Sequence, residues 1–217
     1  MSDRDGSKMS RRAFVLRGGA LVGAAVLGGA GYAAVSAPEA AQPTAKMGDG
    51  MRKVLVVYGT GTGCTAGIAE RIGGAVAATG ASVEVVPAKE APDPASYDAI
   101  LVGSGIRAGN WHAPVKAWVA KNAQTLKGKP VAFYTACLTL ATDPTKIDEV
   151  RAYIDPIVAE TGVKPVDVGT FAGWNEPKNF SFLERTIMKM MKAPEGDFRD
   201  WDAIDAWSEK VSGQLLT

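Results

Sequence analysis

A run of small and hydroxyl-bearing residues joins an apolar segment to an alanine-rich one early in the chain. The run comprises Thr60, Gly61, Thr62, Gly63, Cys64 and Thr65. Threonine hydroxyls and the free N–H groups at the start of a helix can together hold a phosphate group, aided by the positive end of the helix dipole. The two glycines allow the backbone to approach the anion closely. The six residues therefore predict a phosphate-binding turn.

Three classes of phosphate-binding turn compete for this pattern. A P-loop requires Lys and then Ser or Thr after its last glycine, and Cys64 stands in that place, which disfavours a Walker-type NTPase. A dinucleotide fingerprint, G-x-G-x-x-A, is matched by Gly61, Gly63 and Ala66, with Glu84 as the acid for a ribose hydroxyl. The third class is the hydroxyl-rich pattern T-x-T-G-x-T.

The elements around the turn must place it at the edge of a sheet. Apolar strands are expected at about 53–58, 82–87, 98–104, 130–136 and 164–171, and helices at about 65–78, 112–125, 145–161 and 201–215. The connection from 87 to 97 is too short for a full helix. This alternation predicts a doubly wound parallel sheet with its ligand at the carboxyl ends of the strands. A dinucleotide dehydrogenase would require a sixth strand and a substrate domain, for which the chain has no room.

Several segments carry a resemblance to a known family. The T-x-T-G-x-T turn resembles the phosphate loop of flavodoxins, which hold the 5′-phosphate of FMN without a cationic side chain. YDAILVGSGIRAGNWHAPVKAWV at 97–119 is similar to the third strand and flavin loop of menaquinone-dependent protoporphyrinogen dehydrogenases, as are FYTACL at 133–138 and TFAG at 170–173. LERTIMKMM at 183–191, with Asp200 and Trp201 after it, resembles that family's insertion and the start of its last helix.

This resemblance runs from about residue 53 to the C-terminus and implies a fold and a cofactor. The fold is a flavodoxin-like three-layer α/β/α sandwich around a five-stranded parallel sheet of order 2-1-3-4-5, and the cofactor is FMN. Besides the turn, the resemblance places two further loops around the flavin ring. Counting the turn as the first loop, the second loop comprises Ser104, Gly105, Ile106, Arg107, Ala108, Gly109 and Trp111, and the third comprises Ala136, Cys137 and Leu138.

Three side chains in or next to the second loop have alternative roles. Trp111 either stacks on the flavin ring or covers the following helix. Arg107 balances charge at the flavin, or binds a substrate carboxylate, or is a surface arginine. His112, the only histidine, serves either in proton transfer or simply at the start of the helix that Pro114 stiffens. The related enzymes show a second histidine where this chain has Asn110.

The insertion suggests a partner. Leu183, Ile187, Met190 and Met191 recur at helical spacing, and basic residues gather on another face. Such a helix, Leu183 to Met191, packs on the domain, or lies on an anionic membrane, or admits a quinone tail. Its likeness to the insertion of quinone-linked relatives favours the membrane.

Three functions follow from these observations. The first is an FMN enzyme that passes electrons from a tetrapyrrole or another reduced donor to a membrane quinone. The second is an exported electron carrier that serves redox protein partners and has no substrate of its own. The third is a nicotinamide-dependent quinone reductase, for which no second nucleotide loop is visible.

The first fifty residues differ in character from the rest. Ser10 to Leu16, SRRAFVL, matches a twin-arginine export signal, and an uncharged Gly/Ala-rich run follows from Gly18 to Ala37. Residues 1–37 are thus expected to be a signal peptide or an N-terminal membrane anchor, 38–51 a flexible linker, and 52–217 the folded domain. The domain is expected either in the periplasm or at the outer face of the cytoplasmic membrane.

Composition bounds the remaining classes. The 217 residues, 47% of them hydrophobic, suffice for one well-packed domain. From Met51 onward there are 18 basic and 19 acidic residues, a net charge of −1, without a basic stripe, so nucleic acid is not expected as a partner. One histidine and no paired-cysteine motif predict no metal site. Cys64 and Cys137 are expected to be free thiols, because a third strand would separate their parent strands.

Overall fold

The computed structural model of the chain describes residue 40 and residues 42–216. The expected signal peptide or anchor at 1–37 therefore lies outside the described residues. Within the described part, none of the helices combines the length and the hydropathy that crossing a bilayer requires.

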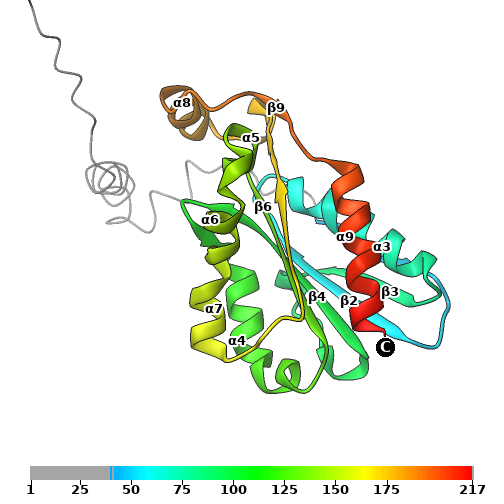
Figure 1. The fold of residues 1–217 in the computed structure, drawn as a ribbon. Helices are drawn as coiled ribbons and strands as arrows, with labels where there is room; N and C mark the ends of the chain where they lie inside the picture. The colour runs from blue at the N-terminus through cyan, green and yellow to red at the C-terminus, as the bar shows by residue number, and fades with distance from the viewer. Residues whose placement is uncertain (1–39, 41, 217) are drawn as a thin grey trace, which may run out of the picture.

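One mixed sheet forms the centre of the molecule (Figure 1). Its strands are β1 (Ala45–Met47), β2 (Lys53–Gly59), β3 (Ser82–Pro87), β4 (Ala99–Arg107), β5 (Asn110–Trp111), β6 (Val131–Cys137) and β7 (Val168–Ala172). The spatial order is β1-β3-β2-β4-β6-β7, and β5 pairs with the end of β4. The strands β3, β2, β4, β6 and β7 are neighbours in this order and run parallel. Numbered along the chain as 1 to 5, they have the order 2-1-3-4-5, which confirms the prediction.

Helices cover both faces of this sheet. The helices of the described residues are α3 (Cys64–Ala78), α4 (Ala113–Lys127), α5 (Thr139–Thr142), α6 (Ile147–Arg151), α7 (Asp155–Thr161), α8 (Phe182–Met190) and α9 (Trp201–Leu215). Helices α3 and α9 lie on one face, and α4, α6 and α7 lie on the other (Figure 1). The predicted three layers are thus present. A separate two-stranded ribbon, β8 (Trp174–Asn175) with β9 (Gly196–Asp197), flanks α8 in the chain.

Strand β2 shows how the sheet serves two cores. Val54, Val56 and Tyr58 point into the cluster beneath α3 and α9, whereas Leu55 and Val57 point into the cluster beneath α4 and α7. All five side chains are fully buried. A strand buried on both faces has no polar side, which explains the unbroken apolar run in the sequence.

The expected flexible linker at 38–51 requires a correction. Ala45–Met47 form β1, which pairs antiparallel with β3, Ala45 lying opposite Val85. Without β1, β3 would be an edge strand with unpaired backbone groups, and β1 satisfies them. The sequence prediction is wrong here because three residues of a short edge strand carry no periodic signal of their own.

Other boundaries shift in smaller ways. The helix expected at 145–161 is divided into α6 and α7 by a 3₁₀ turn, Ala152–Ile154, and Pro156 stands in the first turn of α7. Proline cannot donate a backbone hydrogen bond, so the chain starts a new helix there. Between Pro87 and Tyr97 there are two short 3₁₀ turns in place of a helix, as predicted.

Candidate functional site

The predicted phosphate turn lies at the carboxyl end of β2 and leads directly into α3. Thr60 Oγ1 accepts a hydrogen bond from the Gly63 amide at 3.0 Å, which closes the turn. Gly63 has φ of +89°, a conformation that favours glycine. Helix α3 begins at Cys64 without a side-chain cap. The first amides of α3 lack partners within the helix and are therefore available to an anion.

Thr65 adds a buried hydroxyl to this turn. The residue is fully buried, and among the described residues its Oγ1 finds no hydrogen-bond partner. The hydroxyl lies beside β4, since a Cβ atom built on Gly105 would be 3.1 Å from it. An unpaired hydroxyl is costly in a folded protein. A bound phosphate oxygen would satisfy it, so this feature fits an anion ligand.

The second predicted loop is a β-hairpin. Strands β4 and β5 are joined by Ala108 and Gly109, whose φ angles are +49° and +75°. Two successive positive φ angles are typical of the tight turns that match the twist of a hairpin. Arg107 pairs with Asn110 across the hairpin, which places the arginine beyond the edge of the main sheet. The loop residues thus stand over the same edge as the phosphate turn.

The structure places two residues of this loop at the start of α4. The hydroxyl of Ser104 accepts a hydrogen bond from the backbone amide of His112 at 2.8 Å, and His112 is the N-cap residue of α4. The imidazole lies against the end of β2, since a Cβ on Gly59 would be 2.8 Å from its Nδ1. His112 therefore does begin the helix, and its role in proton transfer stays a prediction.

Trp111 belongs to the core in this structure. Its side chain is 4% exposed and packs edge-on against Phe133, with 5.3 Å between ring centroids. Two roles were proposed for Trp111. The contacts show the ring packed beneath α4, and little of its surface is left for stacking on a flavin.

The third loop lies at the carboxyl end of β6. Ala136 stands opposite Gly105 in the sheet register, which brings the second and third loops together. The thiol of Cys137 donates to Thr139 Oγ1 at 3.2 Å, and Leu138 leads into α5. All three predicted loops therefore meet at one edge of the sheet.

Both cysteines are buried free thiols, as predicted. Burial raises the pKa of the Cys64 thiol to about 11, although the positive charge of Arg199 acts in the opposite direction. At neutral pH the thiol is therefore protonated. Cys64 adds neither a nucleophile nor a negative charge to the phosphate turn.

Trp174 lies over the phosphate turn and was missed by the sequence analysis. Its indole Nε1–H donates to Thr62 Oγ1 at 3.1 Å, and its ring lies 3.4 Å from a Cβ built on Gly63. The signal was present in its position, because Trp174 follows TFAG at the carboxyl end of the last strand, where the three predicted loops converge.

Arg199 fixes Trp174 in place. Its guanidinium lies 4.4 Å from the centroids of both Trp174 and Trp201, and it forms an ion pair with Asp197. The hydrogen bonds from Arg199 lower the pKa of the Asp197 carboxyl. Cation–π contacts of a largely buried guanidinium hold the rings in position. No pattern in the sequence distinguishes Arg199 from a surface arginine.

Arg107 connects the hairpin to the insertion. Its guanidinium forms a 2.8 Å ion pair with Glu184 of α8 and lies 3.5 Å from a Cβ built on Gly61. Glu184 also accepts hydrogen bonds from the amide and hydroxyl of Ser181, both at 2.8 Å. Burial opposes ionisation of Glu184, but these bonds and the Arg107 charge outweigh it, so the pKa of the carboxyl is lowered. The β4–β5 hairpin and α8 are thus joined by an ion pair, and its arginine lies beside the turn at residues 60–65.

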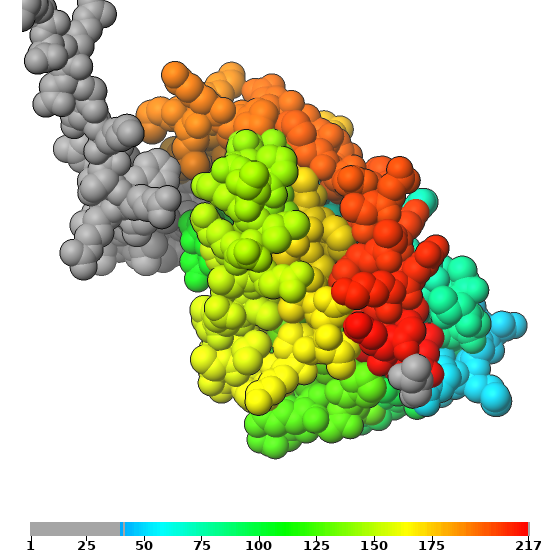
Figure 2. Space-filling model, in the orientation of Figure 1, coloured from blue at the N-terminus to red at the C-terminus, as the bar shows by residue number. Residues whose placement is uncertain are grey.

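Helix α8 leaves its apolar side chains exposed. Phe182 is 85% exposed, Met190 70% and Met191 64%, and Leu183 and Ile187 are exposed as well. The orange residues of the insertion form one end of the molecule in Figure 2. The apolar face of α8 therefore does not pack on the domain, which was one of the alternatives.

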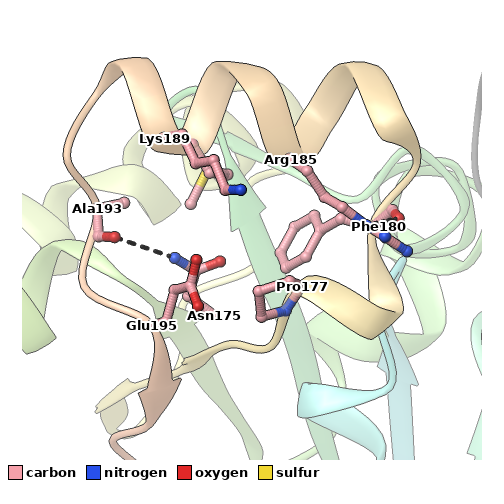
Figure 3. Close-up of a pocket in the computed structure, with 8 residues that line it drawn as sticks. Asn175, Pro177, Phe180, Arg185, Lys189, Ala193 and Glu195 are labelled. Atoms are coloured by element: carbon pink, nitrogen blue, oxygen red, sulfur yellow. Dashed lines mark hydrogen bonds between the residues drawn. The ribbon is translucent and has the colours of Figure 1, made fainter.

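The inner side of α8 lines a very small cavity (Figure 3). Its volume is about 10 Å³, and Arg185 and Lys189 contribute to its wall. The amide of Asn175 closes the opposite side by donating to Ala193 O and Pro194 O at 3.4 and 2.8 Å. This space holds about one water molecule and is too small for an organic ligand.

Comparison with known proteins agrees with this geometry. A family model described as a flavodoxin domain matches residues 55–202. Protoporphyrinogen IX dehydrogenase [quinone] from Escherichia coli (strain K12) is 23% identical over 171 residues, which cover 74% of this chain and 94% of that protein. The protein of the same name from Leishmania major is 26% identical over 164 residues, covering 70% of this chain and 71% of the relative.

A solved structure shows the same fold. Oxidised flavodoxin 2 from Bacillus cereus superimposes with a TM-score of 0.52 at 18% identity, and the match covers 75% of this chain and 99% of that one.

Proposed function

The chain belongs to the flavodoxin domain family, and we propose from this premise that it is an FMN-dependent oxidoreductase that passes electrons from a reduced donor to a membrane quinone. Membership of the family implies a flavin cofactor. The choice of FMN rests on the turn at residues 60–65, which offers threonine hydroxyls and helix amides to a single phosphate group.

The residues present fit such a cofactor. The unpartnered hydroxyl of Thr65 and the uncapped start of α3 suit the phosphate. Residues 104–109 and 136–138 would hold the ring at the same edge of the sheet. Bound flavin supplies the electron transfer that amino-acid side chains lack, and the protein contributes binding, orientation and electrostatics.

Arg107 and His112 are the residues that we propose to act on the reacting groups. Arg107 is 57% exposed despite its contact with Glu184, so its charge can serve an anionic partner at the cofactor edge. His112 stands where the second loop enters α4, within the same edge, and an imidazole there is suited to holding a proton.

The observation that best supports a quinone acceptor is the exposed apolar face of α8, which lies next to the edge of the sheet where the three predicted loops meet. Five exposed apolar side chains, Phe182, Leu183, Ile187, Met190 and Met191, are accompanied by basic residues on the same helix and its end. Such a surface suits an anionic membrane, where apolar groups enter the headgroup boundary and cations contact lipid phosphates. The ion pair between Arg107 and Glu184 joins this helix to the β4–β5 hairpin, which supports the proposal because the hairpin carries residues expected at the flavin.

The relatives named protoporphyrinogen IX dehydrogenase [quinone] suggest a tetrapyrrole as the donor. The twin-arginine motif at Ser10 to Leu16 supports export, which would place the domain at the outer face of the cytoplasmic membrane. An exported protein is separated from haem precursors in the cytoplasm, so another reduced donor is part of the proposal.

The test follows the visible spectrum of the full-length chain, purified in detergent, under anaerobic conditions. We expect a flavin spectrum that bleaches on addition of protoporphyrinogen IX and returns when a menaquinone analogue is added. A flavin that dithionite reduces and the quinone reoxidises, but that protoporphyrinogen IX leaves unchanged, would retain the quinone function and exclude this donor. A flavin that no quinone reoxidises would overturn the proposal in favour of an electron carrier between proteins.

A further inference from the structure

The chain immediately before β2 reaches the phosphate turn. Ala40 and residues 42–47, which we call the N-terminal strap, run along the edge of the domain and end in β1. The strap precedes residue 55, where the match to the flavodoxin domain begins. Nothing in the family match therefore assigns it a role.

The strap holds the turn through Gln42. The side-chain amide of Gln42 donates to the backbone carbonyl of Thr60 at 3.1 Å. Both residues are buried, Gln42 being 9% and Thr60 2% exposed. A polar side chain that is removed from water in this way must be held by its hydrogen bonds, and this one ends on the turn.

Two further contacts fix the strap on either side of Gln42. The hydroxyl of the buried Tyr58 donates to the carbonyl of Pro43 at 2.8 Å. The amide of Ala40 approaches the carbonyl of Gly61 at 3.5 Å, and its Cβ lies 3.4 Å from a Cβ built on Gly63. The strap therefore touches the outer side of the turn at successive residues.

These contacts determine which way the amides of the turn point. In a trans peptide the C=O and N–H groups point in opposite directions, and the described residues contain no cis peptide. Because the Thr60 and Gly61 carbonyls face the strap, the amides of Gly61 and Thr62 face away from it. Within residue 40 and residues 42–216, neither amide finds a backbone acceptor. Two neighbouring amides that both face away from the strap can donate to one anion.

We propose that Gln42 of the strap is a positioning residue of the cofactor site, which fixes the Thr60–Gly61 peptide so that its N–H faces the FMN phosphate. This inference rests on the proposed function, since it requires FMN at this turn. The ligand group that it concerns is the phosphate and not the ring.

The experiment compares Gln42→Met with the unchanged full-length chain after removal of the flavin. Methionine keeps the length of the side chain but cannot donate to the Thr60 carbonyl. Kd values for FMN and for riboflavin, which lacks the phosphate, are measured from the quenching of flavin fluorescence. We expect the Kd for FMN to rise about tenfold, the equivalent of one hydrogen bond, and the Kd for riboflavin to stay the same.

Thr44→Val is the matched control within the strap. Its hydroxyl donates to the exposed carboxylate of Glu90, away from the turn, so this variant is expected to bind FMN as the unchanged chain does. The Tm of each flavin-free protein shows whether a variant has lost its fold, and we expect that of Gln42→Met to stay close to the unchanged value.

Each remaining outcome counts against the inference. An unchanged Kd for FMN in Gln42→Met would show that the strap does not orient the turn. A loss for FMN accompanied by a large fall in Tm, or by an equal loss for riboflavin, would reduce Gln42 to a structural role. If the unchanged chain bound riboflavin and FMN equally, the turn would not hold a phosphate, and the strap could not act on one. If it bound no flavin at all, the proposed function itself would fail.

Discussion

A threonine hydroxyl that is buried without a partner weakens a folded protein, and Thr65 carries one in the phosphate turn. The hydroxyl lies beside Gly105, and a Cβ atom built on Gly105 would be 3.1 Å from Thr65 Oγ1. A residue that lowers stability without helping the fold is typical of a ligand site, because a ligand supplies the missing partner. Thr65 is therefore the side chain at which stability and binding should respond in opposite directions.

We predict that Thr65→Val leaves the flavin-free protein as stable as before, or more stable, and weakens FMN binding about tenfold or more. Valine fills the same space without an unpaired hydroxyl, and a hydrogen bond to a charged phosphate contributes about 1.5–3 kcal/mol. The Tm without flavin and the Kd for FMN, measured by fluorescence quenching, give the two quantities.

Thr161→Val is the matched control for this substitution. Its hydroxyl is buried too, but it donates to Ile157 O at 2.6 Å and accepts from the Val163 amide, far from the turn. This variant should lose stability and retain its FMN affinity. If both variants lost stability and neither lost affinity, Thr65 would not contact the cofactor.

At the scale of elements, α8 is a helix that the domain does not need for its own core. A capping box formed by Ser181 and Glu184 starts it, and none of its residues is fully buried. Short helices in water depend on packing of an apolar face. The face of α8 is exposed, so we infer that a membrane supplies the packing.

We predict that the double substitution Phe182→Ser and Met190→Ser slows electron transfer to menaquinone in anionic vesicles about tenfold and leaves transfer to a water-soluble quinone unchanged. Each apolar side chain that enters a bilayer contributes about 1–3 kcal/mol of binding, which serine would remove. Anaerobic reoxidation of the reduced flavin is followed with each acceptor.

Val166→Ser is the control for the loss of exposed apolar surface. Val166 is 48% exposed and lies at the opposite end of the sheet, where its amide bonds to Val131 O. It should behave like the unchanged chain with both acceptors. Equal slowing with soluble and vesicle-bound quinone in the α8 variant would place the effect at the flavin and contradict a membrane role.

The elements also show what the sequence allows one to predict. The position of the turn at residues 60–65, the parallel strands and α9 were predictable, because their signals are local: hydroxyls and glycines at fixed spacing, buried apolar runs and helical periodicity. β1, Trp174 and Arg199 were not, since each depends on a partner distant in the chain. β1 has a role only once β3 lies at the edge, and Arg199 is distinguished only by the two rings that enclose it.

At the scale of the whole molecule, several carboxyls have lowered pKa values, and Asp167, Glu184 and Asp205 among them pair with Lys210, Arg107 and Arg71, which are far away in the chain. Hydrogen bonds or ion pairs lower the pKa of five carboxyls: Asp143, Asp167, Glu184, Asp197 and Asp205. A carboxyl whose pKa is lower in the folded state stabilises the fold when it is ionised. This contribution is complete above the usual pKa values of about 4 and is lost as the pH falls through the folded-state values.

We therefore predict that the Tm falls steeply on acidification from about pH 5 to about pH 3, and that Asp197→Asn lowers the Tm at pH 7 while making it less dependent on pH. The charge of Arg199, whose side chain is only 10% exposed, would then lack its carboxylate between the two indole rings, which is more costly than loss of a surface pair. Asp205→Asn, which removes the partner of the half-exposed Arg71, is the matched surface control and should shift the Tm by only about 1–3 °C. Thermal unfolding of the flavin-free variants across this pH range measures both effects.

A Tm that does not respond to acid would mean that these carboxyls are equally stabilised in the unfolded chain. An equal response of the two variants would mean that the Arg199 contact is no stronger than one at the surface, and that Trp174 is held over the phosphate turn by packing alone.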